Sequence, residues 1–490
     1  MTRMFQSSPI RYAPLLLAAA IAAGCASTGG LAPQGRPLDA NGLQAQRSLA
    51  AVAFSEADFP RQDWWTALGD PQLDTLVAEA LRGTPSLQAA DARVRQAQAQ
   101  AGLADVARKP DLSASAQLTS VQLPETLAPA PLGGELNTSG VLMLNFKWAP
   151  DLWGGQQAQY EAAVGQLRAT KVDAQAARLM LSSNIARTYI ALAQAHDAHD
   201  VAEREARRSS GLLDLGRQRV KAGLDNQMQL RQAESGIAAA QQQSQAAQQQ
   251  IDALRNALAA LLGQGPDRGL AIIRPALLAA AAPALPSVMP SELLGHRPDV
   301  VAARWRVEAA SRGIDATKAS FKPSVNLSAI VGLAAPGLSE LFSSDALLGF
   351  GGPALSLPIF DGEHLRANLA KSDADYDLAV ANYNQSLVAA LHEVADAVQA
   401  ARSLDAQVAS ATQARDAAAK AFELASARYK AGLGTQLDVL AAQRPLLQLD
   451  QQLATLRAQR YLAAIDLDRA LGGGLVLNSP VNTHTAATSP

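Results

Sequence analysis

The chain contains the same pattern twice. The stretch TPSLQAADARV (84–94) resembles RPDVVAARWRV (297–307), and in each copy a second proline follows 25 residues after the first. Further along, APDLWGG aligns with LPIFDGE, RVKAGL with RYKAGL and LLGQG with ALGGG, at an offset that stays between 208 and 213 residues. Four such pairs in one order indicate an internal duplication, and the Ala/Pro-rich stretch AAAAPALPSVMP separates the halves. The fold therefore consists of two copies of one unit.

Both halves have the same internal order. A helical segment comes first, two strand-like stretches follow, and a very long helix and a shorter one complete the unit. KAGL separates the last two helices, because glycine suits a helix C-terminus. The expected helices span 72–108, 156–222 and 226–262 in the first half, and 291–321, 363–431 and 435–471 in the second.

The lengths of the helices limit how they can pack. The 67 residues of 156–222 make a rod of roughly 100 Å. Two shorter helices placed end to end about match it. A rod of this length needs neighbours along its whole length, and the frequent alanines allow helices to approach closely. An ordinary soluble coiled coil is the alternative if the strands are ignored.

The strand-like stretches argue against a simple coiled coil. DLSASAQLTSV, GVLMLNFKW and SVNLSAIVGL alternate apolar and polar residues over about ten positions, which is the pattern and length of a membrane β-strand. In the second of them we expect Leu142, Leu144, Phe146 and Trp148 to face lipid, and Lys147 to face the lumen. The sequence thus predicts strands that cross a membrane.

The number of strands predicts an oligomer. The fourth stretch, LGFGGPALSLPIF, contains Pro353, which requires an edge or a bulge. Four strands cannot close a barrel, and an open edge cannot lie in lipid. Three copies would supply twelve strands, although closure alone does not exclude two or four copies. Aromatic residues near the helices would form an interfacial girdle: Trp148, Trp153, Phe321 and Phe360.

The only cysteine, Cys25, lies at the end of an N-terminal targeting segment. Arg3 and Arg11 precede the apolar stretch LLLAAAIAA, which is too short to span a bilayer, and IAAGC resembles a lipoprotein cleavage site. We expect cleavage before Cys25 and lipidation of its thiol, since two or more acyl chains anchor a protein stably. Ordinary signal cleavage nearby is the alternative.

These features divide the chain into six segments. They are a lipoprotein signal peptide (1–24), a lipidated N-terminal segment (25–70), the first structural repeat (71–263), an Ala/Pro linker (264–290), the second repeat (291–474) and a polar tail (475–490).

Signs of catalysis or of nucleic-acid binding are weak. The net charge of −2 gives no basic field for nucleic acid, and no phosphate-binding loop, nucleophile elbow or zinc-protease helix occurs. HDAH places His196 and His199 three residues apart, but no further ligands lie nearby in the sequence. We expect no enzyme activity, no cofactor and no metal.

Five motifs resemble the TolC-type outer-membrane factor family, in its lipoprotein branch that serves tripartite efflux pumps. They fall in the family's order and are DWWTALGDPQLDTLVAEAL (63–81), LLGHRPDVVAARWRV (293–307), ASFKPSVNLSA (319–329), LSLPIFDGEHLRA (355–367) and ARYKAGLGTQLDVLAAQR (427–444). The resemblance implies an α+β membrane protein: a trimeric twelve-stranded barrel in the bacterial outer membrane, continued into the periplasm by an antiparallel coiled-coil helical barrel.

The same resemblance implies a function and a site. Such a protein is the passive exit duct for drugs or toxic compounds, which a periplasmic adaptor and an inner-membrane RND-type transporter deliver. Leu437 and Asp438 match the family's periplasmic constriction, whereas a second acidic position falls on Ala441. Export of polypeptides by the same fold is the alternative function. A lipid-anchored coiled coil or enzyme is a further one, and it would be soluble once Cys25 is removed.

Overall fold

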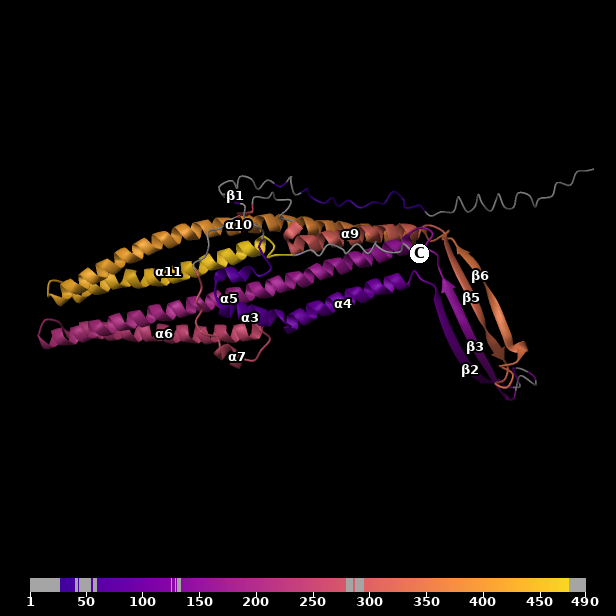
Figure 1. The fold of residues 1–490 in the computed structure, drawn as a ribbon, viewed down its shortest axis with the longest axis horizontal. Coiled ribbons are helices and arrows are strands. Elements are labelled where there is room, and N and C mark those ends of the chain that lie inside the picture. Colours follow the sequence, from indigo (N-terminus) through magenta and orange to yellow (C-terminus); the bar gives the residue numbers. More distant parts are fainter. Residues whose placement is uncertain are drawn as a thin grey trace, which may run out of the picture. The chain divides into compact units, whose positions relative to one another are not determined.

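The protein forms two compact units, each built from both halves of the sequence. The structure, a computed structural model, describes residues 27–39, 43, 54–55, 60–124, 126–127, 129, 134–278, 285–286 and 295–475. Unit 1 comprises Met1–Pro37, Arg93–Thr170 and Ala303–Tyr383, and unit 2 comprises Leu38–Ala92, Lys171–Ala302 and Asn384–Pro490. Figure 1 traces the elements along the chain.

Unit 1 contains the predicted four-stranded sheet. Its strands run antiparallel in the order β2-β3-β5-β6, so β3 of the first repeat pairs with β5 of the second. Pro353 lies in β6, the last strand in this order, which agrees with the expected edge position. The strands are β2 (Asp111–Gln122), β3 (Leu136–Trp148), β5 (Ser324–Ala335) and β6 (Leu347–Ser356).

The strand register gives the sheet two chemically different faces. Leu144 lies opposite Ala114 on one side and Val331 on the other, so the three share a face. The same face carries Leu142, Phe146 and Trp148 with their partners Ala116, Leu112, Leu333, Ala329 and Leu327, none of which is charged. Lys147 lies on the opposite face, between Asp111 and Ser328.

The aromatic residues near the strand ends differ in their surroundings. The Trp153 indole donates to the carbonyl of Pro323 over 2.6 Å, and Phe360 is fully exposed. Phe321, which we expected in an interfacial girdle, is instead buried with Ile314, Leu365 and Leu369. That prediction was wrong because the sequence does not show that Phe321 packs between the helices before and after the β5–β6 pair.

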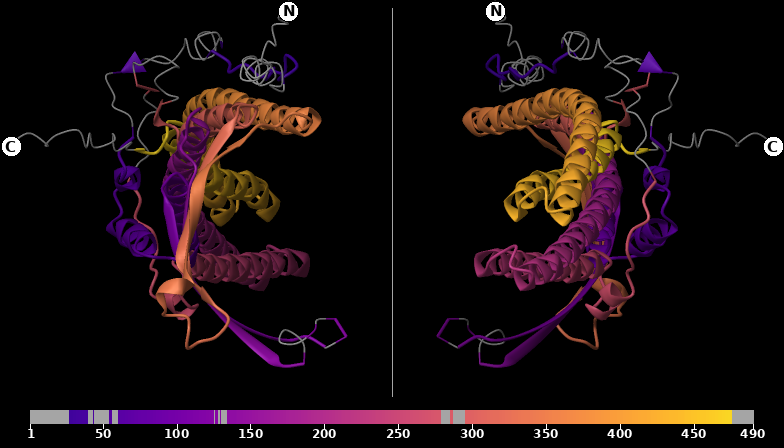
Figure 2. Two further views of the ribbon diagram at one scale, coloured as in Figure 1. Left: turned by 90° about the vertical axis from the view of Figure 1, so that its right-hand side faces the viewer. Right: turned by 90° about the vertical axis from the view of Figure 1, so that its left-hand side faces the viewer.

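The long helices end where the sequence predicts. They are α5 (Gly155–Lys221) and α10 (Gly362–Lys430), each followed by a 35-residue helix, α6 (Gln227–Leu261) and α11 (Gln436–Ala470). Each lies within one residue of its expected bounds. Gly223 and Gly432 of the two KAGL motifs have φ of 73° and 74°, a conformation that glycine adopts without strain. Figure 2 views these two helical hairpins from both ends.

The helix expected over 72–108 is broken in two. The structure has α3 (Pro71–Leu81) and α4 (Pro85–Val106), separated at Gly83, whose φ is 154°. The break follows from Pro85, which favours the first turn of a new helix and disfavours a helical residue before it. In the second repeat, α9 (Pro298–Ala319) precedes the strands. The shorter elements are η3 (Trp64–Leu68), α7 (Asp267–Leu270), η4 (Ser344–Ala346) and the parallel pair β1 (Phe54–Ser55) and β4 (Leu285–Pro286).

The largest apolar core lies in unit 2. Residues of η3, α3, α5, α6 and α11 meet there around Tyr189, which is fully buried. The Tyr189 hydroxyl donates to Asp70 Oδ2 over 2.7 Å, and Asp70 Oδ1 accepts from the N–H of Gln72 at the start of α3. Asp70 is thus the N-cap of α3, and its hydrogen bond with Tyr189 fixes α3 on α5.

A buried arginine joins three helices in unit 2. Arg297, just before α9, is only 6% exposed. Its guanidinium donates to both oxygens of Asp299 (3.1 and 2.7 Å), to Glu393 of α10 (2.9 Å) and to the carbonyl of Ala470 in α11 (3.2 Å). Arg297 therefore holds α9 against the α10–α11 hairpin.

Candidate functional site

Two short connections between helices form the ends of the hairpins in unit 2, and we call them the turns. The first joins α5 to α6 and the second joins α10 to α11. Asn226 and Gln229 form a capping box at the start of α6, and Thr435 and Asp438 form one at the start of α11. In such a box each side chain binds the backbone N–H of the other residue, which fixes the direction of the returning helix.

Three residues connect the two turns, and we call Arg219, Asp225 and Tyr429 the tip cluster. Asp225 Oδ2 accepts the Tyr429 hydroxyl proton over 2.5 Å and the Arg219 Nε–H over 2.9 Å. Arg219 Nη1 also donates to the carbonyl of Tyr429 (3.1 Å), and its guanidinium lies 4.6 Å from the centre of the Tyr429 ring. The first hairpin is thereby bound to the second.

Burial makes the tip cluster strong. Tyr429 is fully buried with Leu212 and Val439, and little of the Asp225 carboxylate is exposed. Burial, and then the hydrogen bond to Asp225, raise the pKa of Tyr429 to about 12, so the phenol remains a donor at neutral pH. Loss of one member would leave buried polar groups unpaired.

Leu437 and Asp438, the residues predicted at the constriction, are both exposed at the start of α11. Leu437 is 71% exposed, whereas Val439 beside it is buried. Asp438 Oδ2 accepts from the N–H and the hydroxyl of Thr435 at 2.8 and 2.9 Å. These bonds, followed by the nearby charge of Arg428, lower the pKa of Asp438 and keep it ionised. Asp438 thus also caps a helix, which our sequence interpretation missed.

The other predicted residues lie elsewhere. Leu142, Leu144, Phe146 and Trp148 share one face of the sheet in unit 1. Cys25 lies outside the described residues. The members of the tip cluster were not predicted, because Asp225 and Tyr429 are 204 residues apart in the sequence. The pairing of RVKAGL with RYKAGL was the one signal that placed them in equivalent turns.

Metal binding receives no support from the described part of the chain, where no group of three His, Cys, Asp or Glu side chains could hold an ion. His199 lies 3.9 Å from Glu203, and burial lowers the pKa of His196. Within the same residues, no helix combines the length and apolarity that crossing a bilayer requires.

Known proteins resemble the chain over most of its length. It is 41% identical to the fusaric acid resistance protein FusA of Burkholderia cepacia, over 74% of this chain and 68% of that protein. It is 33% identical to the pyoverdine export outer membrane protein OpmQ of Pseudomonas putida, over 86% and 90%. Among solved structures, the outer membrane protein VceC of Vibrio cholerae superposes with a TM-score of 0.79 at 38% identity, over 85% of this chain and all of that one.

One family profile matches both repeats of the chain, and this match identifies the family. The sequence profile described as "Outer membrane efflux protein" matches residues 76–264 and again residues 289–473. These two matches contain the four strands of the sheet and both helical hairpins, and together they cover more than half of the chain. The chain belongs to the outer membrane efflux protein family.

Proposed function

We propose that the protein is the passive outer-membrane exit duct of a tripartite efflux pump. A periplasmic adaptor and an inner-membrane RND-type transporter deliver the cargo, and the duct performs no chemistry. The observation that carries this proposal is the combination in one chain of a sheet with an uncharged face and long helical hairpins joined at their tips. The sheet would cross the membrane, and the hairpins would form the wall of a periplasmic tunnel.

The two open edges of the sheet support assembly as a homotrimer. Each sheet ends in β2 on one side and β6 on the other. Unpaired edges cannot lie in lipid, so β6 of one copy would pair with β2 of the next, and three copies would close twelve strands. The relatives named for fusaric acid resistance and pyoverdine export favour small molecules as cargo rather than polypeptides.

The alternation in β3 predicts which side chains meet lipid. We expect a cysteine at position 146 to be protected from a water-soluble thiol reagent in intact membranes, whereas a cysteine at position 147 reacts. A one-residue slip would place Lys147 in hydrocarbon, at a cost of roughly 2–4 kcal/mol near the midplane. Maleimide labelling of Phe146→Cys and Lys147→Cys checks this, and equal reaction of both would rule out a membrane strand.

The N-terminal segment supports Cys25 as a lipid attachment site. Leu31 packs against the cluster of Phe321, Leu365 and Leu369, next to the ends of the strands. The N–H groups of Gln34 and Gly35 donate to Asp377 Oδ1 at 2.9 and 2.6 Å, which fixes the segment on α10. Six residues separate Cys25 from Leu31, a reach of up to about 20 Å, so an acyl chain on Cys25 can enter the leaflet at the base of the sheet.

Mass spectrometry of the mature protein tests the anchor. We expect a chain that starts at Cys25 and carries acyl mass, and Cys25→Ser should lose that mass while the protein still forms trimers, because the barrel and the tunnel supply the association. An unmodified Cys25 in the mature protein would reject lipidation at this position.

Asp438 gives a test of the duct and its constriction. Three ionised carboxylates around one axis attract cations, so the channel in planar bilayers should prefer cations over anions. Asp438→Ala removes this ring and should lower the preference, whereas Glu423→Ala, at an exposed position on α10, should not. If the purified protein forms no channel, the duct is refuted. Selectivity unchanged by Asp438→Ala would place the constriction elsewhere.

A further inference from the structure

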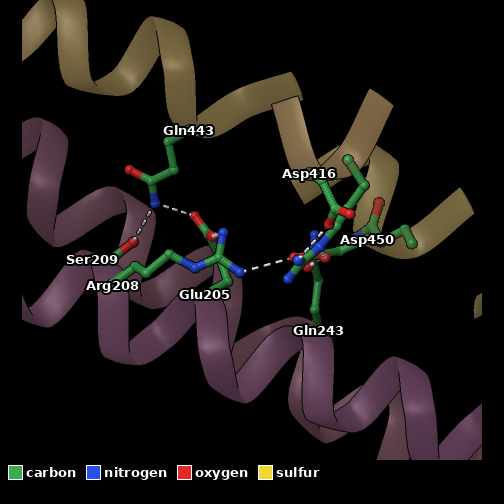
Figure 3. Close-up of polar contacts among 9 residues, drawn as sticks. Glu205, Arg208, Ser209, Gln243, Asp416, Gln443 and Asp450 are labelled. Atoms are coloured by element: carbon green, nitrogen blue, oxygen red, sulfur yellow. Dashed lines mark hydrogen bonds and ion pairs between the residues drawn. The ribbon is translucent and has the colours of Figure 1, made fainter. Parts of the chain in front are cut away.

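A second group of polar contacts joins the hairpins well away from the tips. We call Glu205, Arg208 and Ser209 of α5, Arg415 of α10, and Gln443 and Asp450 of α11 the inter-helix cluster. All six belong to unit 2. Figure 3 shows the side chains of α5 and α11 meeting between the helices, with Asp416 and Gln243 nearby.

Asp450 is the centre of this cluster. Its side chain is only 4% exposed, and two guanidinium groups from different helices bind it. Arg208 of α5 donates to Oδ2 over 3.0 Å, and Arg415 of α10 donates to Oδ1 over 3.0 Å. One carboxylate of α11 thus holds the long helices of both repeats.

Gln443 makes the second set of contacts, two turns nearer the tip. Its amide donates to Glu205 Oε1 and, over 3.3 Å, to Ser209 Oγ, and all three residues are buried. A Cβ added at Gly236 of α6 would lie 3.3 Å from Ser209 Oγ, so α6 also passes close to this point. The inter-helix cluster therefore involves all four helices of the two hairpins, over about two turns of α11.

The distances along the helices separate this cluster from the tips. Glu205 lies sixteen residues before the end of α5 at Lys221, and Gln443 and Asp450 lie seven and fourteen residues after the start of α11 at Gln436. At 1.5 Å per residue, the members of the inter-helix cluster are about 10–24 Å from the turns, and Asp450 is about 21 Å away. An apolar group that includes Leu212 and Val439 lies on the tip side of the inter-helix cluster.

The two clusters differ in whether a partner protein can reach them. Removing one partner from a buried ion pair costs roughly 3–5 kcal/mol, because the other charge stays buried. The tip cluster adjoins exposed residues, Leu433 and Leu437, which a partner protein can touch. The inter-helix cluster lies between helices, where Asp450 is bound on both oxygens.

We propose that the inter-helix cluster is the fixed point about which the hairpins move when the tip opens. This inference rests on the proposed duct function and adds positioning residues to it. When the tip cluster releases, the α10–α11 hairpin would separate from α5–α6 only on the tip side of Gln443. The helices on the sheet side would keep their native contacts, so opening would not unzip the tunnel wall.

Hydrogen–deuterium exchange of the full-length protein in detergent tests this proposal. Asp225→Ala, which breaks the tip cluster, should accelerate exchange about tenfold in segments 211–224 and 418–434 and leave 196–204 and 405–414 at the wild-type rate. Adding Asp450→Asn should extend the acceleration to the two sheet-side segments. The carboxamide keeps the shape of the side chain while removing the charge that holds Arg208 and Arg415.

Asp214→Asn is the matched control. It makes the same chemical change on α5, in an exposed pair with Arg217, and should leave exchange at the wild-type rate. Acceleration of the sheet-side segments by Asp225→Ala alone would overturn the proposal.

The fixed point can be tested separately from the role of the tip cluster in closing the channel. If Asp225→Ala does not raise channel conductance, the tip cluster does not hold the channel closed. The fixed point is then judged from Asp450→Asn alone, which must accelerate exchange of both hairpins around residues 200–212 and 408–418. Wild-type exchange there would refute it.

Discussion

Arg297→Ala should destabilise the protein, because it removes a buried guanidinium that contacts α9, α10 and α11. The substitution removes the hydrogen bonds of this guanidinium to Asp299, Glu393 and the carbonyl of Ala470. The two carboxylates are 48% and 39% exposed, so water can solvate them, whereas the buried carbonyl loses its donor, which costs about 1–3 kcal/mol. We expect the thermal midpoint of the purified protein in detergent to fall by on the order of 5 °C.

Arg312→Ala is the control for that experiment. Arg312 forms an ion pair with Glu161 at 3.1 Å, but its side chain is 45% exposed, and exposed pairs contribute about 0–1 kcal/mol. The midpoint of Arg312→Ala should stay near that of the wild type. Equal midpoints for the two variants would show that Arg297 does not hold α9 in place.

Asp225→Ala should turn a closed channel into a leaking one. Without this carboxylate, the Tyr429 hydroxyl and the Arg219 guanidinium lose their shared acceptor, and the two turns keep only the weaker hydrogen bonds to the carbonyls of Tyr429 and Gln229. We expect the open probability in planar bilayers to rise at least several-fold. Cells that carry the variant should become sensitive to large hydrophilic antibiotics that the outer membrane normally excludes.

Tyr429→Phe separates the contributions within the tip cluster. It removes one donor to Asp225 and keeps the ring on which Arg219 stacks, so its leak should be smaller than that of Asp225→Ala. Asp214→Ala, at an exposed position on α5, should not leak. A wild-type open probability for Asp225→Ala would exclude the tip cluster from holding the channel shut.

The sequence predicted the elements well because their signals are local. The KAGL motifs set the ends of α5 and α10 to within one residue, since glycine at this position needs no long-range contact to stop a helix. Alternation over ten residues likewise fixed the strands and their order in each repeat. The break before α4 was missed although Pro85 signals it, because the helical pattern continues on both sides.

The contacts that connect the repeats could not be predicted in the same way. Arg219 and Tyr429, or Glu205 and Gln443, meet only after two hairpins pack side by side. Nothing in their own neighbourhood marks them as partners. Asp438 was singled out as a constriction residue, and its second role as a helix cap depends on the conformation of Thr435.

The pairing of β3 with β5 has a consequence for how the chain matures. Leu144 and its partner Val331 are 187 residues apart, and each unit takes segments from both halves of the sequence. The first β-hairpin is therefore synthesised long before its neighbouring strand exists. Pairings this distant in sequence form slowly, and an unpaired strand edge is prone to aggregation. Periplasmic chaperones would have to shield that hairpin until the second half arrives, and a chain truncated in the linker would remain their client.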